Sequence, residues 1–132
     1  MERVEVKLVK DKRASDAREA IISFQFSERI KSELIIAARL LGEISELKRD
    51  ELAGGKKMLL SFLGALLGEV NLANSILKEQ NFREAGVKVE EAVERVSSDE
   101  YLEATRCVSE ATSRVTTSGG RAMQMLKQKG LL

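Results

Sequence analysis

Histidine, proline and tryptophan are absent from the sequence, and Cys107 is its one cysteine. Without histidine the chain cannot form a Ser-His-Asp triad, a Cys-His dyad, a histidine-ligated zinc site or the Glu-x-x-His motif of ferritin-like di-iron bundles. A single cysteine excludes an internal disulfide, and no glycine-rich segment has the spacing of a phosphate-binding loop. We therefore expect a protein that is not an enzyme and that uses no cofactor.

The lack of proline also bears on the fold. Proline interrupts helices and marks turns, and the chain has none in 132 residues, while only 4% of its residues are aromatic. This composition favours long helices over a sandwich or a barrel, and the length fits one domain with its own core. We predict an all-α fold over residues 1–132, an antiparallel bundle of about four helices.

The first residues have a different pattern. Over residues 2–10 the apolar residues alternate with charged ones in the period of two that is typical of a strand. The apolar set is Val4, Val6 and Leu8, and the charged set is Arg3, Glu5 and Lys7. We therefore predict that residues 1–14 form an extended N-terminal arm or short strand, and that residues 15–132 form the helical bundle.

The next segment has the three- and four-residue spacing of an amphipathic helix, and this spacing continues from residue 15 until Gly54 and Gly55. A helix over 15–53 is about 58 Å long, whereas the following helix, over 56–79, is about 36 Å long. A single compact chain cannot cover the excess. Either the first helix breaks within residues 21–27, or its overhang pairs with a second copy of the chain.

The helix predicted over 56–79 is the most apolar part of the sequence, with apolar side chains over more than half of its circumference. It is therefore central or lies at an interface between copies of a homodimer. Gly64 and Gly68, one turn apart, indicate tight packing against another helix. The candidate interface residues are Phe24, Phe26, Leu59, Phe62, Leu63 and Leu66.

Two further helices are expected in the last third of the chain. Asn81 with Glu84 and Ser97 with Glu100 have the spacing of capping boxes, which begin helices. The final helix then has the heptad spacing of a coiled coil, with small seam residues. Its seam is Tyr101, Ala104, Val108, Ala111, Val115, Ser118, Ala122 and Met125. Within it, Gly119 and Gly120 form either a hinge or two weak positions in a packed helix.

Charge is balanced overall, at +1, but unevenly distributed. Residues 81–104 hold three basic and seven acidic side chains, and residues 105–132 hold five basic and one acidic. We expect the two segments to attract each other within the fold or across a dimer. A basic tail that binds nucleic acid is the alternative.

The N-terminal order of a short strand followed by helices resembles the ribbon-helix-helix repressors, in which paired strands enter the major groove of DNA. The resemblance implies that Arg3, Glu5 and Lys7 face the bases. Glu5 is unfavourable beside phosphates, and no glycine stands at the expected turn near Phe24 and Phe26. The nucleic-acid candidates, from this segment and the last helix, are Arg3, Lys7, Arg114, Arg121, Lys127 and Lys129.

Carboxylates give one weak enzymatic alternative. Helical nucleotide pyrophosphohydrolases bind magnesium with Glu-x-x-Glu on one helix and Glu-x-x-Asp on the next, and Glu43 with Glu46 resembles the first half. The second half is missing, because Leu72 stands where Glu69 would need an aspartate three residues later. The weak metal candidates are therefore Glu43, Glu46 and Glu69, and a solvated helix face explains them better.

The longest uncharged stretch, Met58–Gly68, is about half of what a membrane crossing needs, so we expect no membrane partner. The first residues lack the layout of a signal peptide, and a cytoplasmic location is expected. The sequence thus predicts a self-associating protein–protein interaction or assembly module that forms a homo-oligomer. A nucleic-acid binder and a metal-dependent pyrophosphohydrolase-like enzyme are the alternatives.

Overall fold

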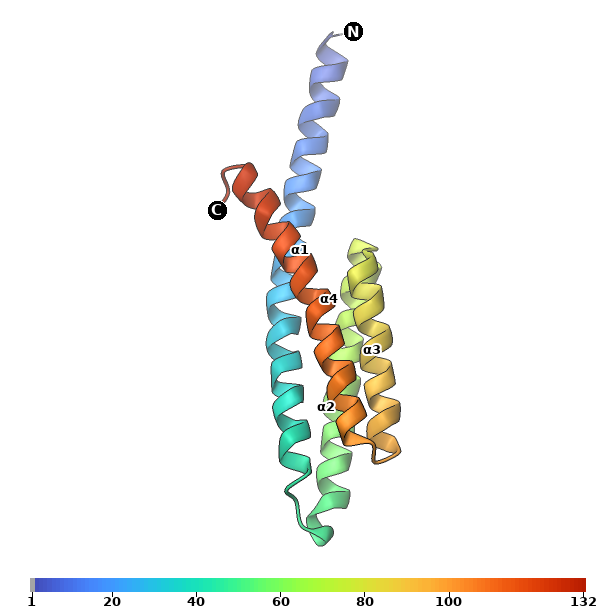
Figure 1. Ribbon diagram of the computed structural model, residues 1–132. Helices are drawn as coiled ribbons and strands as arrows, with labels where there is room; N and C mark the ends of the chain where they lie inside the picture. The colour runs from blue at the N-terminus through green and yellow to red at the C-terminus, as the bar shows by residue number, and fades with distance from the viewer. Residues whose placement is uncertain (1) are drawn as a thin grey trace.

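Residues 2–132 form four long helices joined by short turns (Figure 1). The computed structural model describes the backbone of residues 2–132 and the side chains of residues 16–132, and it has no strand in that part of the chain. The helices are α1 (Glu2–Ile44), α2 (Arg49–Leu77), α3 (Gln80–Ser97) and α4 (Tyr101–Gln128). This confirms the predicted all-α bundle.

The helices form a four-membered ring in which each one packs against two neighbours. α1 packs against α2 and α4, and α3 packs against α2 and α4, whereas no Cα atoms of the diagonal pairs lie within 8 Å of each other in the described chain. Successive helices run antiparallel, as Figure 1 shows. Short connections between long helices lead to this up-and-down arrangement, because a turn of two to four residues leaves the chain only enough length to fold back beside itself.

Each helix contributes one apolar stripe to a common core. The fully buried side chains include Ile30 and Leu34 of α1, Leu63 and Val70 of α2, Phe82 and Val89 of α3, and Val108 and Val115 of α4. Small residues separate them, among them Ala37, Ala85, Ala92 and Ala111. Phe82 is the largest fully buried side chain, and burying a side chain of that size contributes up to about 3 kcal/mol.

The boundary between the first two helices differs from the prediction. α1 ends at Ile44 and α2 begins at Arg49, so that Gly54 and Gly55 lie inside α2. The backbone N–H of Lys48 donates to the carboxylate of Glu51 at 3.0 Å, which satisfies a donor at the start of α2. This local capping decides the boundary, because a glycine pair weakens a helix without being required to end it.

The N-terminal prediction of a strand is wrong, because α1 is helical from Glu2 and continues without a break through residues 21–27. A lone strand leaves its backbone groups without partners, whereas a helix satisfies them internally. At about 65 Å, α1 is longer than α2 at about 44 Å, and its first turns extend beyond the bundle (Figure 1).

The two predicted capping boxes are displaced. α3 begins at Gln80 with Glu79 as its N-cap, and α4 begins at Tyr101. The hydroxyl of Ser97 donates to the carbonyl of Val93 at 2.9 Å inside α3, so it is not available to cap α4. α4 is continuous through Gly119 and Gly120, and its buried seam follows the predicted heptad until Ala122, after which Leu126 is buried in place of Met125.

Candidate functional site

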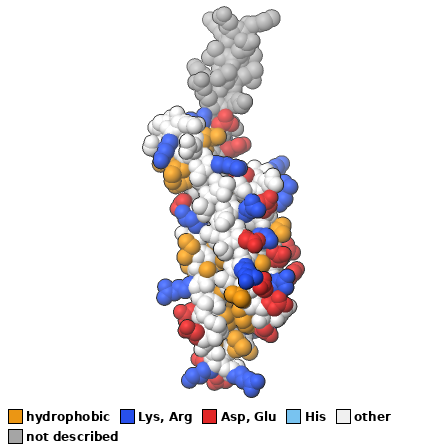
Figure 2. Space-filling view, in the orientation of Figure 1, with side chains coloured by type: hydrophobic (Ala, Val, Ile, Leu, Met, Phe, Trp, Pro, Cys, Tyr) orange, Lys and Arg blue, Asp and Glu red, His pale blue; other side chains and the backbone are white. Residues whose placement is uncertain are grey.

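The outer side of α2 is unusual for its lack of charge. Between Met58 and Leu77 the one charged residue is Glu69. The exposed positions of this stretch include Met58, Ser61, Gly64, Ala65, Gly68, Leu72, Ser75 and Ile76. On the opposite side of the bundle, where α4 lies in front, Figure 2 shows basic and acidic side chains interspersed. α2 is also, by length and composition alone, apolar enough to cross a membrane, and 28% of its most apolar window is buried.

Large apolar side chains lie on this side of the molecule. On α2, Met58 is 72% exposed, Leu72 50% and Ile76 52%. On α1, Ile36 and Leu40 are also exposed. We call these five residues, with the partly buried Phe26 and Phe62 between the helices, the α1–α2 face.

Helical spacing places both sets on one surface. Ile36 and Leu40 follow Arg29 at steps of seven and eleven residues, so they share its side of α1. Arg29 forms an ion pair with Glu69 of α2, with 3.4 Å between Nε and Oε1, which shows that this side of α1 borders α2. Leu72 and Ile76 follow Glu69 at three and seven residues, so they border the same groove from α2.

Gly64 and Gly68 lie open on the outer side of α2. A Cβ atom at either position would meet nothing within 4 Å. Packing within one chain therefore does not require these glycines, and the tight packing predicted at them is not with a helix of the same chain. Each costs about 1 kcal/mol of helix stability relative to alanine, and the described chain offers no compensating contact.

Two carboxyl groups and one guanidinium meet in the middle of the α1–α2 face. The Glu33 carboxyl of α1 lies beside the carboxyl of Glu69 of α2, whose Oε1 pairs with Arg29 Nε at 3.4 Å. The other oxygen of Glu69, Oε2, is buried and lacks a donor. Burial, followed by the hydrogen bond and the charge of Glu69, raises the pKa of Glu33 to about 7, and Arg29 opposes this shift. Arg29 also lies over the ring of Phe26, 5.3 Å from its centroid.

A cavity of about 300 Å³ opens where α1 and α4 extend past the turn between α2 and α3. There the Ser118 hydroxyl donates to Glu79 Oε1 at 2.6 Å and lies 3.1 Å from the hydroxyl of Ser23. Ser23 and Ser118 are buried, so these bonds satisfy groups that would otherwise destabilise the fold. The network ties the α2–α3 turn to α1 and α4, which is a structural role.

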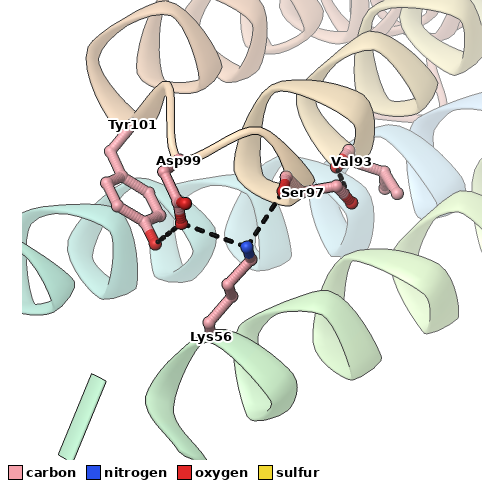
Figure 3. Close-up of polar contacts among 5 residues, drawn as sticks. All are labelled: Lys56, Val93, Ser97, Asp99 and Tyr101. Atoms are coloured by element: carbon pink, nitrogen blue, oxygen red, sulfur yellow. Dashed lines mark hydrogen bonds and ion pairs between the residues drawn. The ribbon is translucent and has the colours of Figure 1, made fainter. Parts of the chain in front are cut away.

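The other end of the bundle is closed by a polar cluster (Figure 3). Lys56 Nζ of α2 donates to the carbonyl of Ser97 at 2.9 Å and to Asp99 Oδ1 at 3.0 Å. The hydroxyl of Tyr101 donates to the same Asp99 oxygen at 2.9 Å. These hydrogen bonds, from Lys56 first, lower the pKa of Asp99. Lys56 thus ties the α3–α4 turn, where Asp99 has a positive φ of 61°, to α2.

The metal candidates are not brought together. Glu43 lies in the last turn of α1 and Glu46 in the turn after it, whereas Glu69 is in the middle of α2 beside Glu33 and Arg29. Among the residues with described side chains, no group of three or more histidine, cysteine or acidic residues could hold a metal ion. Sequence reasoning missed Glu33, although its four-residue step from Arg29 places the two on one side of α1.

The nucleic-acid candidates are dispersed. Arg114 Nε pairs with Glu84 of α3 at 3.0 Å, and Arg121 lines the cavity beside Glu79. Lys127 lies in the last turn of α4 and Lys129 follows it, while the side chains of Arg3 and Lys7 lie outside the described residues. Lys88 of α3 also pairs with Glu110 of α4 at 2.8 Å. In that pair the base belongs to the acidic segment and the acid to the basic segment, so it is the pair of Arg114 with Glu84 that joins the two segments by their net charges within one chain, as one of the two interpretations predicted.

The predicted interface residues divide into two groups. Leu59, Leu63 and Leu66 are at most 3% exposed, because they pack in the core of a single chain and so cannot form the surface of a dimer. Phe24, Phe26 and Phe62 are half-buried, and the last two belong to the α1–α2 face. The exposed apolar residues of α2 are instead Met58, Leu72 and Ile76.

Cys107 offers no reactive thiol. It is 8% exposed in α4, and its sulfur lies 3.6 Å from Glu91 Oε2 of α3. Burial, followed by the charge of Glu91, raises the pKa of the thiol. A raised pKa disfavours the thiolate, which is the nucleophilic form. Cys107 is therefore a packing residue.

Comparison of the chain with protein-family models, with curated proteins and with solved structures finds no match.

Proposed function

We propose that the chain is a non-catalytic helical-bundle protein that associates with a second copy of itself through the α1–α2 face and serves as an interaction or assembly module. The observation that carries this proposal is the row of exposed apolar side chains Met58, Leu72 and Ile76 on α2, which has one charge between Met58 and Leu77, with Ile36 and Leu40 beside them on α1. Exposed apolar patches of this kind mark interaction sites in soluble proteins.

A second copy fits this face better than a charged partner does. Glu69 is the one charge on α2 between Met58 and Leu77, and it is already paired with Arg29. A strongly acidic or basic partner would therefore find little net charge to complement, whereas an identical face would cover the exposed apolar side chains with its own. A two-fold axis brings the same patch of both copies together, so the surface only has to be complementary to itself.

The glycines and the dimensions agree with this arrangement. Because Gly64 and Gly68 leave open space above the helix, the backbone of a second α2 can approach closely there. The stretch of α2 from Met58 to Leu77, with Glu69 as its one charge, is about 30 Å long, and with α1 about 10 Å to its side the face covers roughly 600 Å². A standard interface buries about 800 Å² per partner, so side chains at the rim must supply the rest.

Sedimentation velocity tests the proposal with two matched variants. Leu72→Lys places a charge in the centre of the face, and Val87→Lys places one on α3, where Val87 is a similarly exposed apolar residue. We expect the wild type and Val87→Lys to be dimers at tens of micromolar and Leu72→Lys to be a monomer, with a dissociation constant raised by at least about tenfold. A monomeric wild type at these concentrations, or equal effects of both substitutions, would contradict the proposal.

Cross-linking tests the position of the contact. In a Cys107→Ser background, Gly68→Cys is expected to form a disulfide-linked dimer under mild oxidation, because a two-fold axis passing near this glycine would place the two copies of position 68 within the about 7 Å that a disulfide can span. Val87→Cys in the same background is the control and should stay unlinked. Equal cross-linking of the two variants would exclude a specific contact at α2.

A further inference from the structure

Glu33 and Glu69 lie in the centre of the surface proposed for association. If both carboxyl groups are ionised, neither can donate a hydrogen bond to the other. Two negative groups would then be in contact, with Glu69 Oε2 buried and lacking a donor. Arg29 does not correct this, because its Nε contacts Oε1, the other oxygen of Glu69, at 3.4 Å. A protonated Glu33 carboxyl has one O–H, which it can donate to the neighbouring Glu69 carboxylate.

We propose that Glu33 and Glu69 share one proton, and that loss of this proton above neutral pH dissociates the dimer formed through the α1–α2 face. The second half of this inference rests on the proposed function. The face is then a pH-sensitive interface, controlled by a carboxyl pair between two helices of the same chain.

The surroundings of Glu33 place its titration near neutral pH. Its pKa rises from the ordinary 4.5 to about 7 through burial and through Glu69, and Arg29 alone acts in the opposite direction. These two side chains, one from α2 and one from α1 itself, are the charged groups that act on Glu33; among the described side chains of α4, which packs on the other flank of α1, none does.

Charge balance connects the proton to association. With the proton present, Glu33, Glu69 and Arg29 together carry no net charge, so a second copy can cover them. Without it, each copy has one net negative charge at the centre of the face, and a two-fold contact brings the two charges together. Burying an uncompensated charge in an interface is strongly unfavourable, so association must weaken as the pH rises through the pKa of Glu33.

The variant Glu33→Gln keeps the shape of the side chain and a hydrogen-bond donor but removes the titration, because its amide can donate to Glu69 at every pH. We expect the dimer dissociation constant of the wild type to rise about tenfold between about pH 6 and about pH 8.5, while that of Glu33→Gln changes less than about twofold. Glu43→Gln, an exposed glutamate of the same helix, is the control and should follow the wild type. Sedimentation velocity gives all three constants.

A second measurement tests proton sharing between Glu33 and Glu69 separately from dimerisation. Carbon-13 NMR of a Leu72→Asn variant, which weakens the face without placing a charge three residues from Glu69, follows the titration of the Glu33 carboxyl directly, and a midpoint near pH 7 is expected. A midpoint near the ordinary 4.5 would overturn proton sharing. A midpoint near 7 with a wild-type dimer equally tight at both pH values would overturn the coupling. A wild type that stays monomeric at every pH would overturn the proposed function and the coupling together, and leave the proton-sharing pair standing on its NMR midpoint.

Discussion

Gly119 of α4 lies against Ser27 of α1, so closely that a Cβ atom at position 119 would be 3.0 Å from the Cβ atom of Ser27. Both residues are buried, and the contact lies beyond the apolar core, where α1 and α4 are lined by Ser23, Ser27 and Ser118. Small side chains at this level let α1 and α4, the two helices that extend past the α2–α3 turn, approach each other closely. The glycine pair in α4 is therefore asymmetric, with one member in a contact and the other exposed.

The first prediction compares the two glycines. Gly120→Ala adds a methyl group that meets nothing within 4 Å, so it should stabilise the protein by about 1 kcal/mol through helix propensity. Gly119→Ala has the same gain in propensity but forces α1 and α4 apart at Ser27, at a cost of about 1–3 kcal/mol. Urea denaturation should therefore rank Gly120→Ala above Gly119→Ala by at least about 1 kcal/mol. Equal free energies of unfolding for Gly119→Ala and Gly120→Ala would show that α1 and α4 can move apart at Ser27 without a loss of stability.

The second prediction concerns the hydroxyl of Ser27. This group is buried, with Ser27 2% exposed, and its oxygen has no hydrogen-bond partner. Ser27→Ala removes an unsatisfied polar group and keeps the Cβ contact, so it should stabilise the fold by about 1 kcal/mol or more. Ser32→Ala on the same helix is the control, because the exposed Ser32 hydroxyl donates to the Glu28 carbonyl at 3.0 Å. Thermal melts should show a larger gain in Tm for Ser27→Ala.

The third prediction concerns the tie between Lys56 and Asp99. Because Lys56 and Tyr101 lower the pKa of Asp99, this group stabilises the fold above its ordinary pKa of 3.8, and the stabilisation is lost as the pH falls through the lower folded value. Lys56→Met should lower Tm slightly at pH 7 and reduce the loss of stability below about pH 4. Lys57→Met changes an exposed neighbour and should leave the pH profile unchanged. If Tm depends on pH in the same way in the wild type, Lys56→Met and Lys57→Met, the contact between Lys56 and Asp99 does not contribute to the pH dependence of stability.

The fourth prediction concerns Cys107. Because it is buried and its thiol pKa is raised, reaction with a disulfide reagent such as DTNB should be slow in the folded protein and fast in denaturant. We expect the folded rate to be lower by at least about a hundredfold, since reaction then requires opening of the α3–α4 contact. A rate close to that of the unfolded chain would show that α4 opens readily near Glu91.

The sequence was informative where one physical effect dominated. The three- and four-residue spacing predicted the helices and the heptad of α4, because one apolar stripe per helix is what a bundle buries. It failed at Gly54 and Gly55, where the capping by Glu51 at Lys48 was stronger than the glycine signal. It failed also over residues 2–10, where alternation is too short to outweigh a helix that satisfies its own backbone.

The candidate site was harder to predict. Apolar residues surround α2 so widely that the pattern could not distinguish Leu59, Leu63 and Leu66, which fill the core, from Met58, Leu72 and Ile76, which face outward. The contact of Glu33 with Glu69 joins residues on different helices, and it depends on how far α1 and α2 slide past each other. A single sequence contains no direct signal of that register.

The ring of helices described above also has a kinetic consequence. Apart from α1 with α4, every packed pair is adjacent in sequence and joined by a short turn, so most contacts are local. Loop closure then costs little entropy, and chains of this kind refold in microseconds to milliseconds. Only the docking of the first helix on the last closes a long loop, and stopped-flow refolding should show that this single non-local step limits the rate.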